Sequence, residues 1–168
     1  AWDGVEVGHH DKHYLVPFGE FFPLYNELPF IYNWVFETIG SVFVPVQPGI
    51  TFAPLELRGI RYGTYICYES VFPIVAREMV RQGAQVLVNI SNDGWFGKGQ
   101  GLVQHFEMGR IRAIETRRYI LRAGSVGVTA VIGPLGEVKS SIPTRTENVL
   151  HGVYRSLEGQ TLYVRFGD

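Results

Sequence analysis

The sequence of 168 residues contains one cysteine, Cys67, so no disulfide can form within the chain and the fold cannot depend on a disulfide framework. It also lacks an excess of basic residues: Lys and Arg number 15, Asp and Glu number 16, and the net charge is -1. This balance provides no basic field for a nucleic-acid backbone, so we expect no nucleic acid among the partners. No apolar run reaches the roughly 18 residues that a membrane-spanning helix needs.

The start of the chain, AWDGVEVGHHDKHYL, has neither a Met nor the charged and apolar regions of a signal peptide. We therefore expect a soluble domain or a piece of a larger protein. Hydrophobic residues make up 46% of the composition and charged residues 18%, which excludes a disordered or low-complexity chain. The length suits one domain with a core, and neither an internal repeat nor a flexible linker divides it.

Residues 21–46, FFPLYNELPFIYNWVFETIGSVFVPV, form an apolar arm with eight aromatic residues. Its prolines and the charges of Glu27 and Glu37 argue against a transmembrane helix. Apolar residues at helical spacing predict instead a short amphipathic helix between the prolines, on Tyr25, Leu28, Tyr32, Val35, Phe36 and Ile39. Two interpretations stay open: a helix of the protein core, or a segment that lies at a membrane interface or in a lipid-facing groove.

After the arm, strand and helix patterns alternate, which predicts an α/β fold in layers that begins with a βαβ unit. The expected strands cover 60–67, 85–90, 119–123, 128–132 and 138–142, and the expected helices cover 71–82 and 102–117. Ser70 would cap the first helix and Gly83 would end it, while GPLGE would join the last two strands as a hairpin. The second helix places four apolar residues on or near one face: Leu102, Phe106, Ile111 and Ile114.

Cys67 ends the first expected strand and precedes the first expected helix. Functional groups of α/β folds gather at the carboxyl ends of strands, and a helix N-terminus favours thiolate over thiol, so this position suits a nucleophile. A single cysteine more often packs as a small hydrophobe, and that alternative stays open. The loop after the second strand should emerge at the same edge and line one pocket through Asn89, Asn92, Asp93, Trp95 and Phe96.

Charged residues near the start of the chain could assist such a thiol. Lys12 and Glu20 flank the turn LVPFG; a lysine near the thiol would stabilise a thiolate and later an oxyanion, and a carboxylate could orient the lysine or relay protons. Taken alone, each would by default be interpreted as a solvated surface charge. The segment HHDKH at 9–13 suggests a metal site, but its spacing matches no known ligand pattern, so we predict no metal.

Four segments occur in the order DKHYLVPFGEFFPL, ICYES, LVNISNDGWFG and QHFEMGRIRAIETRRYILRAGSVGVTAVIGPLG. Together they resemble the nitrilase-like domain of the bacterial apolipoprotein N-acyltransferase family, within the carbon-nitrogen hydrolase superfamily. The match covers almost all of residues 1–168, which we interpret as one partial domain with the arm at 21–46. The resemblance implies an α/β fold, a nitrilase-like α-β-β-α sandwich that is incomplete because its first part is missing.

The resemblance also implies a role for each matched residue. Cys67 would be the nucleophile that attacks a phospholipid ester and becomes an S-acyl thioester, and Lys12 would stabilise the oxyanions. Glu20 and Glu69 would be further catalytic carboxylates that hold Lys12 and shape the pocket. The substrate pocket would be formed or gated by three aromatic residues: Tyr68, Trp95 and Phe96.

The implied reaction is a ping-pong acyl transfer from a phospholipid donor to the N-terminal amine of a diacylglyceryl lipoprotein, at the periplasmic face of the bacterial inner membrane. It would need no cofactor, and the membrane surface would be a partner. The apolar arm agrees with this reaction, because both substrates are lipids and an apolar segment can contact their chains. Two alternatives stay open: an amidase of the nitrilase superfamily that acts on small amides, and a non-catalytic remnant.

The sequence departs from the family at the general base, a glutamate that precedes the lysine. Before Lys12 the chain offers Glu6, which does not match that position. The family's transmembrane helices, the first half of its sandwich and its final helix are also missing from the printed sequence. We therefore expect the isolated chain to have little or no activity, and its uncovered strand edges and apolar surface to favour association.

Overall fold

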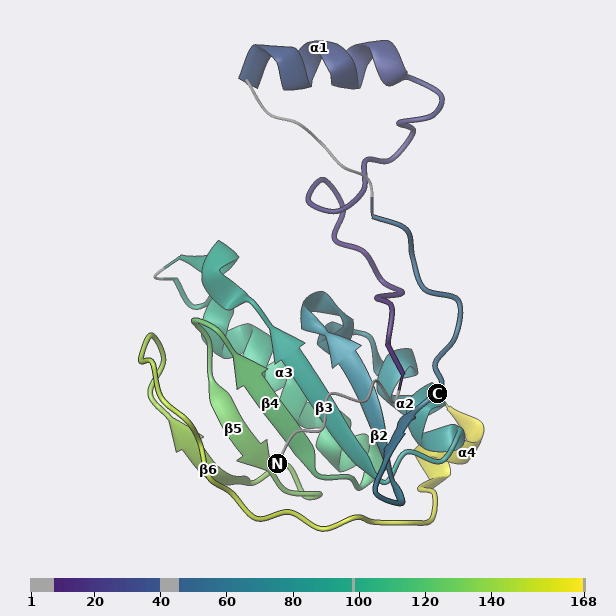
Figure 1. The fold of residues 1–168 in the computed structure, drawn as a ribbon, viewed down its shortest axis with the longest axis vertical. Helices are drawn as coiled ribbons and strands as arrows, with labels where there is room; N and C mark the ends of the chain where they lie inside the picture. The colour runs from purple at the N-terminus through teal and green to yellow at the C-terminus, as the bar shows by residue number, and fades with distance from the viewer. Residues whose placement is uncertain (1–7, 40–45, 98, 168) are drawn as a thin grey trace.

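The computed structural model describes residues 8–39, 46–97 and 99–167. Its body is a sheet in which the strands follow one another in chain order (Figure 1). The strands are β1 (Leu55–Leu57), β2 (Ile60–Ile66), β3 (Val86–Ser91), β4 (Ile120–Gly124), β5 (Thr129–Ile132) and β6 (Val138–Ile142). β2, β3 and β4 pair in parallel, whereas β1 pairs antiparallel with β2, and β5 and β6 extend the other side as an antiparallel hairpin.

Two helices cover one face of the sheet and form the crossovers between its parallel strands. α2 (Pro73–Arg81) joins β2 to β3, and α3 (Gly101–Thr116) joins β3 to β4. Figure 1 shows both helices behind the sheet, and the short helix α4 (Leu162–Phe166) contacts both of them. This arrangement confirms the predicted βαβ unit, the α/β class and the hairpin at GPLGE.

The core lies between the sheet and these helices. Tyr65 on β2 and Leu87 on β3 point into it, and Val75 and Met79 on α2 meet them without exposure to solvent. Gly63 allows the close approach of strand and helix, because a Cβ at this position would lie 2.9 Å from the Cβ of Met79. The inward side chains alternate with outward ones along β2, as expected for a strand that is covered on one face.

The predicted start of the first helix is wrong. Ser70 does not cap it, because Cys67–Val71 form a 3₁₀ turn, η1, and Phe72 takes the N-cap position before Pro73. Proline suits the first position of a helix, since it has no N–H to leave unpaired there. The chain after Cys67 therefore makes a tight turn first and enters an α-helix only after it.

The prediction for α3 is correct for two of its four apolar residues. Leu102 and Phe106 are buried, whereas Ile111 and Ile114 are 46% and 44% exposed. The side of α3 that faces the body also carries polar residues, among them His105, Arg112 and Thr116. β1 and α4 were not predicted, because three and five residues are too few to show a hydrophobic period.

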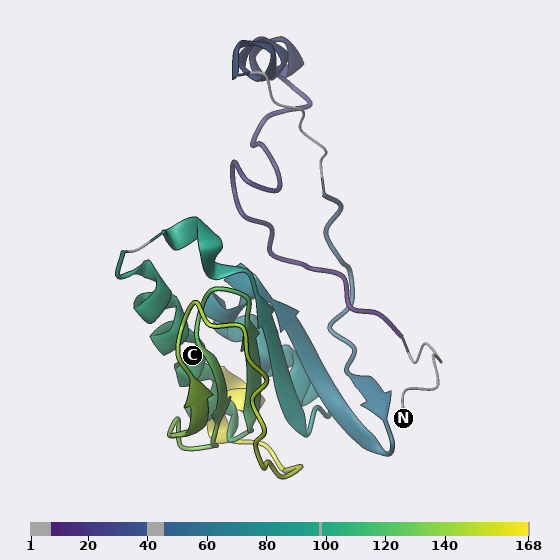
Figure 2. The same cartoon turned by 60° about the vertical axis from the view of Figure 1, so that its left-hand side comes forward.

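The apolar arm projects away from the body, as both views show (Figures 1 and 2). Its helix, α1 (Pro29–Ile39), lies within the predicted stretch. Trp34 and Phe30 on this helix are 66% and 67% exposed, so the interpretation of the arm as a core helix is wrong. Residues 40–45 of the arm lie outside the described residues. Among the described helices, none is long and apolar enough to cross a bilayer.

The arm is stabilised by its own aromatic side chains. The ring of Phe22 meets those of Tyr32 and Phe36 edge to face, with ring centroids 5.1 Å and 5.0 Å apart. The hydroxyl of Tyr32 donates a hydrogen bond of 2.6 Å to the carbonyl of Pro23, which ties α1 to the segment before it. Edge-to-face contacts of this kind stabilise a small cluster beyond simple burial. The arm therefore presents exposed aromatic residues on a locally packed base.

The face of the sheet opposite the helices exposes aliphatic side chains. Ile90 on β3 pairs with Ile66 on β2 and is 53% exposed, and Leu57 at the β1 edge is 48% exposed. We expect the 168-residue chain to associate through this surface, because exposed apolar patches beside strand edges favour self-association. Light scattering after size exclusion should give a mass above the monomer, and Ile90→Asp should lower it. A monodisperse monomer for the unsubstituted chain would contradict this prediction.

Candidate active site

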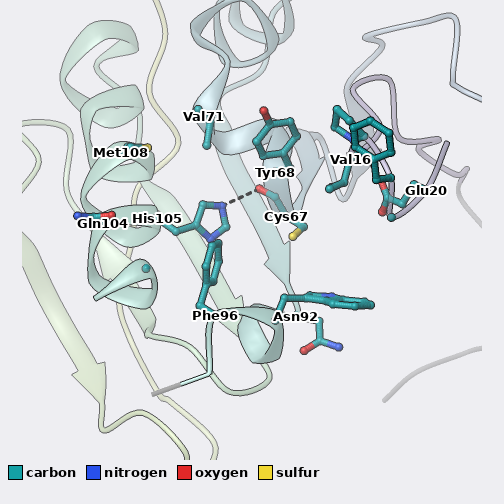
Figure 3. A pocket seen from close by; sticks show the side chains of 15 residues that line it. Val16, Glu20, Cys67, Tyr68, Val71, Asn92, Phe96, Gln104, His105 and Met108 are labelled. Atoms are coloured by element: carbon teal, nitrogen blue, oxygen red, sulfur yellow. Dashed lines mark hydrogen bonds between the residues drawn. The ribbon is translucent and has the colours of Figure 1, made fainter. Parts of the chain in front are cut away.

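A cavity of about 520 Å³ opens where β2 and β3 end, between the segment before the arm, η1 and α3. Figure 3 shows Cys67 near its centre, with Glu20 on one side and His105 of α3 on the other. The lining is mainly apolar and aromatic: Val16, Pro17, Phe18, Gly19, Glu20, Cys67, Tyr68, Val71, Asn92, Trp95, Phe96, Gly101, Gln104, His105 and Met108. Such a cavity can bind an aliphatic chain next to a thiol.

Cys67 is the first residue of η1 and has a backbone φ of +51°. A residue other than glycine is strained in this left-handed region. Residues with such backbone strain cluster at functional sites. The side chain is partly exposed and lines the cavity. The alternative that Cys67 packs as a small hydrophobe therefore explains its surroundings less well than a nucleophilic role does.

Lys12 and Glu20 meet in the structure, as the sequence analysis suggested. The Lys12 ammonium lies 2.6 Å from both oxygens of the Glu20 carboxylate, and the backbone N–H of Val16 donates to the same carboxylate at 2.8 Å. Lys12 is 8% exposed, so it is not an ordinary solvated charge. Glu20 lines the cavity together with Cys67, whereas Lys12 is not among the lining residues. The ion pair therefore joins the buried lysine to a residue of the cavity lining.

Glu69 is completely buried and connects two segments of the site. Its carboxylate accepts a 2.7 Å hydrogen bond from the backbone N–H of Ile66, which precedes Cys67, and another of 2.7 Å from His13, which follows Lys12. It does not line the cavity. It contacts the backbone of the residue that follows Lys12, and its expected role of holding Lys12 stays a prediction.

Two histidines and a glutamate, His10, His13 and Glu69, place their possible metal-ligating atoms within 4.8 Å of one another. By distance alone this group could hold a metal ion. Burial would raise the pKa of Glu69, but hydrogen bonds from His10 and from the backbone N–H groups of Ile66 and His13 lower it. These bonds already engage both carboxylate oxygens and account for the buried charge. The absence of a metal from the mechanism stays a prediction.

The three predicted substrate-binding aromatics all line the cavity. Tyr68 packs edge to face against Phe72, with ring centroids 5.0 Å apart. Trp95 and Phe96 belong to the 3₁₀ turn η2 (Asp93–Phe96), and Trp95 is 86% exposed at the mouth. Phe96 packs against the ring of His105 at 5.5 Å. Asn92 also lines the cavity as predicted, whereas the expected pocket positions of Asn89 and Asp93 are wrong, because both are buried beneath it.

A buried polar network underlies the cavity, and the sequence patterns indicate little of it. Asp93 accepts hydrogen bonds from Ser91 at 2.5 Å and Arg122 at 2.8 Å and lies 2.8 Å from the imidazole of His105. Arg122 also donates to the side chain of Asn89. One feature of the sequence could have indicated this network. Arg122 lies at an inward position of β4, between Leu121 and Ala123, and a charge buried there needs a partner.

The network makes stability depend on pH. Burial would raise the pKa of Asp93, but hydrogen bonds from His105 and Ser91 and the charge of Arg122 lower it from 3.8 to about 2. Because the unfolded carboxyl has the higher pKa, this contribution is complete above about pH 4 and is lost as the pH falls through about 2. It amounts to about 2 kcal/mol.

We therefore expect the free energy of unfolding, measured by urea titration, to fall between about pH 5 and about pH 2.5. In Asp93→Asn the fall should be smaller by about 1.5 kcal/mol, since that side chain no longer titrates and the range ends before the whole contribution is lost. Equal falls in the two proteins would show that Asp93 titrates normally.

A family model of the carbon-nitrogen hydrolases matches residues 2–154, so the chain belongs to the carbon-nitrogen hydrolase family. Within it, the chain is 40% identical over 167 residues to the apolipoprotein N-acyltransferase of Geobacter metallireducens, covering 99% of this chain and 31% of that protein. It is 39% identical over 163 residues to the apolipoprotein N-acyltransferase of Nitrosomonas europaea, covering 94% of this chain and 31% of that protein. The chain thus spans about a third of the length of these relatives, and the predicted resemblance is confirmed.

Solved structures support the fold. The NitFhit protein of C. elegans superposes with a TM-score of 0.61 at 24% identity, covering 85% of this chain and 33% of that one. A carbon-nitrogen hydrolase from Helicobacter pylori gives 0.54 at 21% identity, covering 62% and 43%. At these identities the likeness concerns the fold alone, and it confirms the predicted nitrilase-like α/β class.

Proposed function

We propose that this chain contains the nucleophile and oxyanion-stabilising part of an apolipoprotein N-acyltransferase. The observation that supports this most is the juxtaposition of Cys67 with a cavity of about 520 Å³ whose lining is mainly apolar. A site that handled only small polar amides would not need such a lining, whereas an acyl chain does. The relatives named apolipoprotein N-acyltransferase agree with this choice.

In the proposed first step, the Cys67 sulfur attacks the carbonyl carbon of a phospholipid ester. The carbon–sulfur bond forms and the ester carbon–oxygen bond breaks, so that the thiol proton passes to the departing lysophospholipid oxygen. In the second step the N-terminal amine of a diacylglyceryl lipoprotein attacks the thioester; its proton returns to the sulfur as the amide forms. The Lys12 ammonium, oriented by Glu20 at 2.6 Å, would stabilise the oxyanion in both steps.

The exposed aromatic residues of the apolar arm favour the proposal that the substrates are lipids. Its exposed Trp34 and Phe30, together with Phe18 at the cavity, are 66%, 67% and 66% exposed, and aromatic residues of this kind favour the interface of a bilayer. We propose that the arm rests on the membrane and that the cavity receives an acyl chain from it. The periplasmic face of the inner membrane is the corresponding proposed location.

The experiment that tests this function compares lipid and amide substrates in the protein produced at the full length of its gene. Phospholipid vesicles should release lysophospholipid in a single burst equal to the enzyme concentration, since the thioester waits for an amine; a diacylated peptide with a free N-terminus should restore turnover. Soluble small amides should release no ammonia. Ammonia release without a lipid burst would support the amidase instead, and inactivity with all of these substrates would support a non-catalytic remnant.

We propose further that residues 1–168 alone have little or no activity, because the family's general-base glutamate does not match Glu6, which lies outside the described residues. Intact mass of this chain after incubation with phospholipid should show no acyl adduct. An adduct that disappears in Cys67→Ser would contradict this.

A further inference from the structure

The imidazole of His105 lies directly beneath the backbone of Cys67. Its Nε2 is 3.1 Å from the Cys67 carbonyl oxygen and 2.8 Å from the Ser70 hydroxyl, and its Nδ1 is 2.8 Å from Asp93 (Figure 3). The ring is buried, with 3% of the side chain exposed. Cys67 and Ser70 belong to η1, Asp93 to η2 and His105 itself to α3, so this ring joins three elements around the end of β2.

The chemistry of the two partners determines where the ring protons lie. A carbonyl oxygen only accepts, so the contact with Cys67 is a hydrogen bond only when Nε2 carries a proton. The hydroxyl of Ser70 can then accept the same N–H or turn its own proton elsewhere. The Asp93 carboxylate also only accepts, so its contact with Nδ1 is a hydrogen bond only when Nδ1 carries a proton too. The contacts with Cys67 and Asp93 are therefore both hydrogen bonds only in a ring with a proton on each nitrogen, and the Arg122 guanidinium lies 3.2 Å from Nδ1. The Nε2–H of His105 is therefore directed at the turn that carries the thiol.

Cys67 needs such a contact, because its φ of +51° is unfavourable for a residue with a side chain. The backbone of the preceding Ile66 is held by Glu69 at 2.7 Å. The carbonyl of Cys67 is held by His105. These two bonds, one before and one after the Cα of Cys67, determine the direction in which the thiol points into the cavity.

The set Ser70, His105 and Asp93 has the hydrogen-bond order of a serine hydrolase triad, yet it does not act as one. Ser70 is 1% exposed and does not line the cavity, so no substrate can reach its hydroxyl. The role of His105 is consequently exerted on Cys67, and through its backbone.

We infer that His105 is a positioning residue for the nucleophile: its Nε2–H, oriented by Asp93, bonds the carbonyl of Cys67 and maintains the strained turn that aims the thiol at the bound ester. The inference rests on the proposed function for the identity of the ester. The part of the inference that concerns the orientation of the thiol depends only on the geometry of His105 and Cys67.

The test compares His105→Gln with His105→Met in the protein at the full length of its gene. The two side chains have similar size, but only glutamine offers an N–H at the position of Nε2. The first readout is the second-order rate of Cys67 alkylation by iodoacetamide as a function of pH, which needs no lipid. We expect His105→Met to lower this rate about tenfold, and to lower kcat for acylation with KM unchanged, since misplacement of a reacting atom affects the chemical step. His105→Gln should recover most of both.

Thr116→Ala is the matched control. Thr116 is another buried polar residue of α3, and its hydroxyl donates to the carbonyl of Arg112 at 2.6 Å, away from the cavity. It should lower the melting temperature without changing the alkylation rate. Equal alkylation rates in His105→Gln and His105→Met would overturn the inference. A loss of alkylation in His105→Met in a protein that never accepts phospholipid would leave the positioning role intact and reject the proposed function.

A measurement on the unsubstituted protein decides the matter if His105→Met does not fold. Nitrogen-15 NMR of the histidine ring should show a proton on both Nε2 and Nδ1 of His105. A ring protonated on Nδ1 alone could not bond the Cys67 carbonyl, and this result would overturn the inference.

Discussion

Replacement of Cys67 by alanine is expected to abolish acyl transfer in the protein produced at the full length of its gene. The thiol is the side chain of the cavity that can form a covalent acyl intermediate in the proposed reaction, and it is the only sulfhydryl in the 168 residues. Removing a nucleophile leaves only binding and oxyanion stabilisation, so turnover should fall by about 10³-fold or more. Lysophospholipid release in a quenched single-turnover assay measures this directly.

Two further variants make this result specific. Cys67→Ser retains a nucleophilic oxygen but a much weaker one, so any acylation should be far slower and give an oxygen ester in place of the thioester. Ser140→Ala on β6 is the control, because its buried hydroxyl has no hydrogen-bond partner among the described residues and its removal should cost little. Wild-type turnover in Cys67→Ala would reject the covalent mechanism.

Arg122→Met is expected to be the most destabilising substitution in the polar network. The Arg122 side chain is 1% exposed, pairs with Asp93 at 2.8 Å and also bonds Asn89. Its removal leaves a buried carboxylate without its cation, and breaking a buried pair in this way costs about 3 to 5 kcal/mol. Urea unfolding of the chain, followed by circular dichroism, gives the loss.

A double variant and a control show whether the cost comes from the uncompensated charge. Adding Asp93→Asn to Arg122→Met removes that charge and should recover part of the loss, since the two residues are in contact. Arg81→Met removes an exposed arginine, 56% accessible, that pairs with Glu78 on the same helix, and should cost less than about 1 kcal/mol. A similar cost for Arg81→Met and Arg122→Met would show that the buried pair has no special weight.

The sequence predicted the layers of this fold well, because short-range patterns determine them. The buried strands 60–67 and 85–90 and the helix between them appear as β2, β3 and α2 with boundary shifts of one or two residues. The apolar residues of β2 and the turn at Gly83 produce this pattern locally. The predicted helix start differs from that of α2 because a 3₁₀ turn precedes Pro73. In this turn Glu69 and Ser70 bond residues that are distant in the sequence.

In the candidate site, too, local motifs were recognisable in the sequence and contacts between distant residues were not. Cys67 at the end of a strand, and the LVPFGE motif with Lys12 and Glu20, were recognisable from the printed residues, and the ion pair between the last two forms over eight positions. His105 and Arg122 were not, since their partners lie 38 and 29 positions away in the chain. No local pattern relates such residues.

By itself the sequence determined most of the elements that form, the candidate for the nucleophile and the family that the chain resembles, because strand and helix periods and short motifs are local properties. Only the tertiary structure decided that the arm leaves the core, that Glu69 holds backbone rather than substrate, and that a buried histidine lies under the cysteine. Those outcomes depend on which desolvated polar groups find partners when the sheet, η1 and α3 pack together, and such pairing is decided across the whole fold.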